Sequence, residues 1–163
     1  MSATSTHANA ALIERFYTAF TQLDAETMAS CYHPDVRFSD PAFIDLQGQQ
    51  ASDMWRMLCA RAADFSLEFK VLDADAQQGS AQWVARYQFS KTGNQVVNRI
   101  AAEFRFKDGL IIEHRDRFNL WRWSAQALGI KGLLLGWLPP VQKAISAQAM
   151  VGLKQWQAQQ GRG

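Results

Sequence analysis

The order of its hydrophobic patterns is the feature that most constrains the fold of this chain. Patterns typical of helices come first, and patterns typical of strands follow. Apolar residues recur at intervals of three and four from His7 to Leu23 and again over residues 47–63, as in helices with one buried face. Asp24 stands where a short helix between them would begin, and Pro34 stands where it would end. The first third of the chain is therefore predicted to be helical, apart from a short strand before Pro41.

Alternation of apolar and polar residues predicts strands further along the chain. The expected strands cover residues 36–40, 65–74, 80–90, 96–107 and 110–123. Turn-forming residues at 91–94 and 107–109 separate the last three strands. Helices followed by consecutive antiparallel strands indicate an α+β fold, whereas alternating helices and strands would indicate a parallel sheet.

Length and charge narrow the class of protein. A chain of 163 residues suits one domain with a substantial core. The formal net charge is +2 and the basic residues are scattered, so no nucleic-acid surface is predicted. No apolar run reaches the roughly 18 residues of a membrane span, and the opening residues lack a secretory pattern. We therefore expect a cytoplasmic protein with a disordered tail at 1–6 and with Cys31 and Cys59 as reduced thiols.

The C-terminal segment, residues 124–163, differs from the rest in its crowding of Leu and Trp. A helix is predicted at 141–159, after the Pro139-Pro140 break. The segment could cap the domain, pack between the subunits of a homodimer or lie on a membrane surface. Capping or dimer packing is favoured, because a large exposed apolar patch would otherwise aggregate. Gly132 and Gly136 form a G-x-x-x-G pattern, but Lys131 interrupts the apolar run and no membrane dimer motif is predicted.

Three stretches, 32–41, 103–112 and 113–119, give the chain its resemblance to a known superfamily. They read YHPDVRFSDP, EFRFKDGLII and EHRDRFN, and they resemble the nuclear transport factor 2-like superfamily, which includes ketosteroid isomerase, SnoaL-like polyketide cyclases and limonene-epoxide hydrolase. The resemblance implies that residues 7–123 form a cone, a curved antiparallel sheet wrapped around the N-terminal helices, with an apolar pocket at its open end. It does not fix the reaction, since one fold supports many functions.

The resemblance implies three candidate catalytic residues: Asp116, His114 and Asp40. Asp116 matches the aspartate of the cyclases and the epoxide hydrolase, and Asp40 before Pro41 matches the isomerase base. His114 shares the face of Asp116, because strand side chains repeat every two residues. A carboxylate inside an apolar cone should have a raised pKa and could accept or donate a proton. The alternatives are a structural hydrogen-bonded pair for Asp116 and His114, and a turn residue for Asp40.

The sequence also departs from these relatives. The isomerase uses a tyrosine and a protonated aspartic acid to polarise its substrate, and these positions here are Phe16 and Ala102. Tyr17 lies next to the first but about 100° around the helix. The partners of the hydrolase aspartate are replaced by Trp83 and Ala85. Neither the isomerase nor the hydrolase site is therefore complete in this chain.

The candidate substrate-binding residues are aromatic, with one alanine. They are Phe16, Tyr17, Phe20, Phe38, Trp55, Trp83, Tyr87, Ala102 and Phe118. Such a wall suits a small hydrophobic molecule, although an aromatic stripe is more often simply core. The histidine spacing indicates no metal site, and no cofactor is expected.

Besides a function of the dimer surface and the C-terminal segment, with a vestigial pocket, two functions of the pocket remain open at this point. One is an isomerase, cyclase or hydrolase that uses Asp and His acid–base chemistry without a cofactor. The other is a binding module that holds a small apolar ligand without chemistry, which the loss of both isomerase donors favours.

Overall fold

The computed structural model describes residues 7–161, so the expected tail at 1–6 lies outside the described residues. The helices and strands follow in the order α1 (Ala8–Thr21), α2 (Ala25–Ser30), β1 (Tyr32–Ser39), β2 (Leu46–Gln47), α3 (Gln49–Arg61), β3 (Ser66–Ala74), β4 (Gln78–Gln88), β5 (Gln95–Lys107), β6 (Leu110–Arg117), α4 (Leu120–Leu128), α5 (Ile130–Leu135) and α6 (Pro139–Gln159). The predicted α+β class is confirmed: the run of strands β3 to β6 follows the N-terminal elements α1 to α3, and the helices α4 to α6 come after it.

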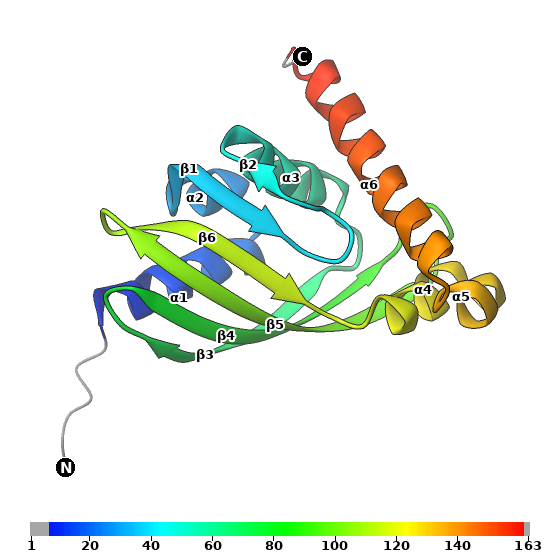
Figure 1. The fold of residues 1–163 in the computed structure, drawn as a ribbon, viewed down its shortest axis with the longest axis horizontal. Coiled ribbons are helices and arrows are strands. Elements are labelled where there is room, and N and C mark those ends of the chain that lie inside the picture. The colour runs from blue at the N-terminus through cyan, green and yellow to red at the C-terminus, as the bar shows by residue number, and fades with distance from the viewer. Residues whose placement is uncertain (1–6, 162–163) are drawn as a thin grey trace.

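The six strands form one curved, open sheet in the order β2-β1-β6-β5-β4-β3. Strands β3 to β6 pair as consecutive antiparallel neighbours, whereas β1 pairs with β6 in parallel. Figure 1 shows α1 lying along the inner side of this sheet, with α2 and α3 beside β1 and β2. Burial alternates strictly along most of β5, so one face of the sheet points to the core and the other to solvent.

Local signals explain where the first two helices begin. The His7 side chain accepts a hydrogen bond from Asn9 N at 3.0 Å, which satisfies a free N–H at the start of α1. Asp24 caps α2 as predicted, and its Oδ1 accepts from Thr27 N at 3.1 Å.

Two boundaries predicted from the sequence are wrong. Helix α2 ends at Ser30, and Pro34 lies inside β1, where the register against β6 shifts between Tyr32 and Arg37. A proline is tolerated there because the irregularity already interrupts the ladder. Strand β6 ends at Arg117, six residues before the expected end, because Asn119 caps α4 by accepting from Arg122 N at 2.9 Å.

The C-terminal helices pack on the domain at points far apart in the sequence. Helix α6 runs from α4 and α5 at one end of the sheet past α3 (Figure 1). Leu153 is buried in the core, Ser146 Oγ donates to Ala42 O at 2.7 Å, and Gln157 Nε2 donates to Asp53 Oδ2 at 3.0 Å. None of the helices within 7–161 is both long enough and apolar enough to cross a membrane.

Candidate functional site

A chain of hydrogen bonds runs through the interior between β1, α3, β4 and β6. Trp55 Nε1 donates to Tyr32 Oη at 2.8 Å, and this oxygen lies 2.7 Å from His114 Nδ1. On the other side of the ring, His114 Nε2 lies 2.9 Å from Asp116 Oδ1. Trp83 Nε1 donates to the same carboxylate oxygen at 3.4 Å. All five side chains are buried, so the polar atoms that form these hydrogen bonds rely on one another, and not on water, for hydrogen-bond partners.

One arrangement of protons satisfies the donors and acceptors of this series of hydrogen bonds. An indole N–H can only donate, so Trp55 uses an acceptor site of the Tyr32 oxygen. When the Tyr32 hydroxyl donates to His114 Nδ1, Nε2 carries the ring proton and donates it to Asp116. One neutral tautomer of His114 therefore satisfies every group, with Asp116 as the final acceptor.

Strand register explains why His114 and Asp116 share this interior. Both lie on the inward face of β6, while Arg115 and Arg117 point outward, as alternation predicts. On β5, Ala102 is paired with Asp116, and its small side chain leaves room beside the carboxylate. The predicted inward face of the last strand is thus confirmed.

Asp40 follows directly after β1 and is half-buried. Its Oδ1 accepts hydrogen bonds from Ala42 N at 2.7 Å and from Phe43 N at 2.6 Å, the local turn that one interpretation of the sequence predicted. Removal from water nevertheless raises the pKa of Asp40 to about 7, and the charge of Asp116 adds to the rise. Asp40 is therefore both a turn residue and a carboxyl group that titrates near neutral pH.

The parallel pairing of β1 with β6 brings the two carboxylates to the same end of the sheet. Phe38 is paired with His114 and Ser39 with Arg115, so Asp40 and Asp116 come next on neighbouring strands. The negative charge of Asp116 at this end of the sheet disfavours ionisation of Asp40 and so raises its pKa. This juxtaposition accounts for the effect of Asp116 on the pKa of Asp40.

Tyr17 lies in the same interior, although its helical position differs from that of Phe16. Both are fully buried, because α1 is enclosed on more than one side. The Tyr17 ring stacks on Phe69 and lies 5.7 Å, centroid to centroid, from that of Trp83. Burial raises the pKa of Tyr17, and the charge of Asp116 adds to it. Among the described residues, Tyr17 Oη is the one buried side-chain N or O atom without a hydrogen-bond partner.

The structure brings the predicted wall residues together, but as closely packed rings. Phe16 and Phe38 contact the His114 ring with centroid distances of 5.5 and 5.0 Å, and Trp55 stacks on it at 6.1 Å. Phe16, Tyr17, Phe20, Phe38, Trp55, Trp83 and Ala102 are buried, and Tyr87 and Phe118 are half-buried.

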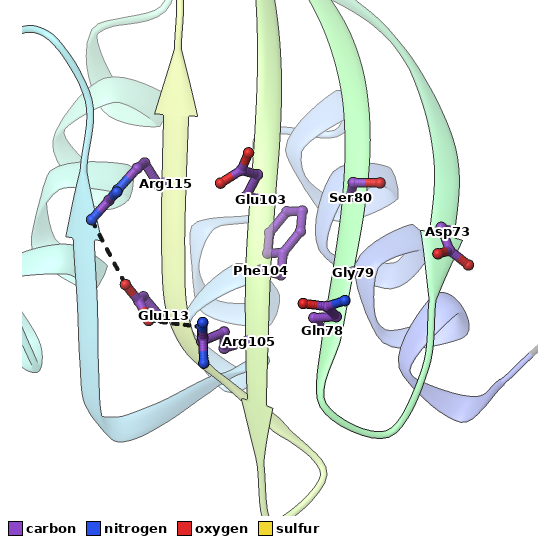
Figure 2. Close-up of a pocket in the computed structure, with 9 residues that line it drawn as sticks. All are labelled: Asp73, Gln78, Gly79, Ser80, Glu103, Phe104, Arg105, Glu113 and Arg115. Carbon is purple, nitrogen blue, oxygen red and sulfur yellow. Dashed lines mark ion pairs between the residues drawn. The ribbon is translucent and has the colours of Figure 1, made fainter.

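Two surface hollows lie away from these residues. One, of about 320 Å³, is on the outer face of the sheet, where Arg105 and Glu113 pair at 3.5 Å and Glu113 and Arg115 at 3.9 Å (Figure 2). The other, of about 300 Å³, lies between α6 and the turn that contains Ser90 and Lys91. Neither is lined by Asp116, so the apolar pocket stays a prediction. The part of the chain that the structure describes has no cluster of three or more His, Cys, Asp or Glu arranged to hold a metal ion.

Sequence reasoning missed Tyr32 of this network and Trp123, which bonds to the predicted wall residue Tyr87. Tyr32 links Trp55 to His114, but the register shift after it breaks the alternation that would have placed it on the inner face. Trp123 donates from Nε1 to Tyr87 Oη at 2.7 Å and was expected in a strand, whereas it lies in α4. A capping Asn at 119 was the available signal for that helix.

Solved structures with the same fold include proteins of several descriptions. A putative polyketide cyclase from Silicibacter sp. TM1040 has a TM-score of 0.65 at 19% identity, over 73% of this chain and 93% of that one. An epoxide hydrolase from M. tuberculosis, described as LEH-like, has a TM-score of 0.60 at 19% identity, over 81% and 96%. A protein with a ketosteroid isomerase-like fold from Catenulispora acidiphila DSM 44928, solved with trimethylamine, has a TM-score of 0.62 at 16% identity, over 71% and 91%.

These identities establish the fold and leave the reaction open. No curated protein matches the sequence. The SnoaL-like domain family matches residues 13–114, which is more than half of the chain and includes Asp40 and His114. This match shows that the chain belongs to the SnoaL-like domain family.

Proposed function

We propose that this protein is an enzyme that moves protons on a small hydrophobic molecule, with Asp116 and Asp40 as its acid–base groups. The observation that carries the proposal is the pair of carboxylates at the ends of two parallel strands, one of which has a pKa of about 7. A group that titrates near the working pH is an efficient proton donor and acceptor. The reaction class is isomerisation, cyclisation or hydrolysis.

Asp116 is held in one orientation for this task. Within the described residues, its hydrogen bonds from His114 and Trp83 both end on Oδ1, which leaves Oδ2 to face a substrate. We assign His114 a positioning role, since both ring nitrogens are already bonded. A relay through Tyr32 would end at Trp55, whose indole N–H does not exchange protons with a substrate.

Tyr17 supplies the group that would hold a substrate oxygen. Its hydroxyl is buried, unpaired and close enough to Asp116 for that charge to affect its pKa. A buried donor without a partner is costly, and a ligand oxygen that accepts from it would recover that cost. In this way Tyr17 would replace the donors that the chain lacks at Phe16 and Ala102.

A second candidate function is binding of an apolar ligand without chemistry. The residues at the two isomerase donor positions favour it, because Phe16 and Ala102 have no hydrogen-bond donor in their side chains to polarise a substrate. In that case Asp116 and His114 would stabilise the core and Asp40 would only shape its turn.

Deuterium exchange into an apolar ketone separates the two functions. The α-protons of 2-tetralone in D₂O, followed by ¹H NMR, should exchange faster with the protein than without it. The catalysed rate should rise through about pH 7 if Asp40 acts as a base, and Asp116→Asn should lower it by a factor of roughly 100 or more. Asp35→Asn, at an exposed carboxylate of β1, is the matched control. Binding of the ketone with no catalysed exchange, or an unchanged rate in Asp116→Asn, would contradict the proposed chemistry.

A further inference from the structure

Helix α5 and the turn after it present large apolar side chains to solvent. Ile130, Leu133, Leu134 and Trp137 recur at intervals of three and four, the spacing of a helix face that normally packs inward. Here their exposed fractions are 74, 54, 62 and 56%. Trp121 and Leu135 are also exposed, and together these six residues form a surface that we call the apolar patch. Figure 1 shows α5 at the corner beyond α4, away from the sheet.

The packing of α5 fixes this outward orientation. Gly132 and Gly136, on the opposite face, are buried against Ser124 of α4. A methyl group added at either glycine would collide with Ser124, with its carbonyl in one case and its hydroxyl in the other. The G-x-x-x-G pattern therefore joins two helices of the same chain, and the bulky side chains have no direction left but outward.

The indole N–H groups of the two tryptophans in the patch need no water, because each already has a backbone acceptor. Trp121 Nε1 donates to Leu133 O at 2.9 Å, and Trp137 Nε1 donates to Leu134 O at 3.0 Å. Each indole thus satisfies its polar atom on the backbone of α5 and leaves its ring for apolar contact. A ring arranged in this way can enter a lipid headgroup region without stranding a donor.

Charge distinguishes this end of the chain from the rest. Residues 117–163 contain six of the 17 Lys and Arg and none of the 15 Asp and Glu, which is a formal charge of +6 against −4 for residues 1–116. Arg122, Lys131 and Lys143 are exposed on the three helices that bear or flank the patch. An apolar patch in a segment with cations and no carboxylates complements an anionic lipid bilayer, which has negative headgroups over an apolar interior.

We propose that the apolar patch docks on the surface of an anionic phospholipid bilayer. The side chains of Ile130, Leu133, Leu134 and Trp137 enter the headgroup region, and Arg122, Lys131 and Lys143 meet the lipid phosphates. A contact between two copies through this segment fits less well, because it would bring cations together without a carboxylate of the same segment to pair with them.

Co-sedimentation of the full chain with vesicles tests this docking. We expect binding to vesicles of equal phosphatidylcholine and phosphatidylglycerol at 50 mM NaCl, with a blue shift of tryptophan fluorescence. Binding should weaken about tenfold or more in 500 mM NaCl or on pure phosphatidylcholine. The double variant Leu133→Gln/Leu134→Gln should lose binding by a similar factor. Leu72→Gln, at an equally exposed leucine of β3, should bind as the wild type does.

Three results would overturn the proposal. One is no sedimentation with anionic vesicles at low salt. Another is a double variant that binds as tightly as the wild type while its circular dichroism is unchanged. The third is a protein that does not bind vesicles but self-associates in sedimentation velocity, with the self-association abolished by the double variant. The patch would then be an interface between copies.

Discussion

Replacement of Asp40 by Asn should change how the stability of the folded protein depends on pH. Asn keeps the side-chain oxygen that accepts from Ala42 N and Phe43 N, so the turn after β1 is preserved. What the variant removes is a carboxyl group whose pKa rises from an ordinary 3.8 to about 7 on folding. The folded state therefore holds its proton over a range in which the unfolded chain has released it.

The direction in which stability changes with pH follows from the linkage between protonation and folding. A group that binds its proton more tightly when folded stabilises the protein at low pH, and this contribution is lost as pH rises toward the folded pKa. Between pH 5 and about 7 the loss is at most about 1.4 kcal/mol per pH unit, or roughly 3 kcal/mol in all. Asp40 keeps some contact with water, so we expect on the order of 1–3 kcal/mol.

Urea unfolding at pH 5 and pH 8 measures this contribution. The Asp40→Asn variant should gain stability relative to the wild type as pH rises from 5 to 8, by that amount. Asp35→Asn, at an exposed carboxylate of β1, should follow the wild type. If the wild type and Asp40→Asn keep a constant difference across this range, the carboxyl group is not displaced from its ordinary pKa and the inferred acid–base pair fails with it.

Two further substitutions probe the buried network. Tyr32→Phe removes the acceptor of Trp55 Nε1 and the donor to His114 Nδ1, and should lower the free energy of unfolding by about 1–3 kcal/mol in urea titrations; an unchanged midpoint would show that these bonds add nothing. Tyr17→Phe removes an unpaired buried hydroxyl and should raise that free energy by about 1 kcal/mol while weakening ketone binding, and a destabilised variant would indicate a partner for this hydroxyl that the proposed role excludes.

Strand positions were the most predictable part of the site. The alternation along β6 placed His114 and Asp116 on one inner face, because a strand in an antiparallel ladder leaves a side chain only two directions. Tyr32 could not be placed in this way, since the register shift in β1 lies between it and the regular part of the strand. Local sequence carries no signal for such an irregularity when the partner strand is 80 residues away.

Other features depend on three-dimensional packing that sequence patterns do not encode. Trp121 and Trp123 alternate with polar residues as a strand would, and only the Asn119 cap indicates the helix that the structure has there. The aromatic residues were correctly expected inside the domain, but whether they surround a space or fill it depends on how their volumes fit together. The carboxylate pair likewise arises from the parallel pairing of β1 with β6, whereas the run of strands predicted an antiparallel sheet.

The hydrogen bond from Gln157 to Asp53 joins a helix outside the family match to a residue inside it. Asp53 lies within the matched residues 13–114, yet one oxygen of this fully buried carboxylate is held by a side chain near the end of α6. In a chain synthesised from its N-terminus, Gln157 is made after all of the matched residues. Asp53 thus gains this partner only after α6 has been synthesised, and Leu153 of the same helix belongs to the hydrophobic core, so residues outside the family match contribute to the packing of residues inside it.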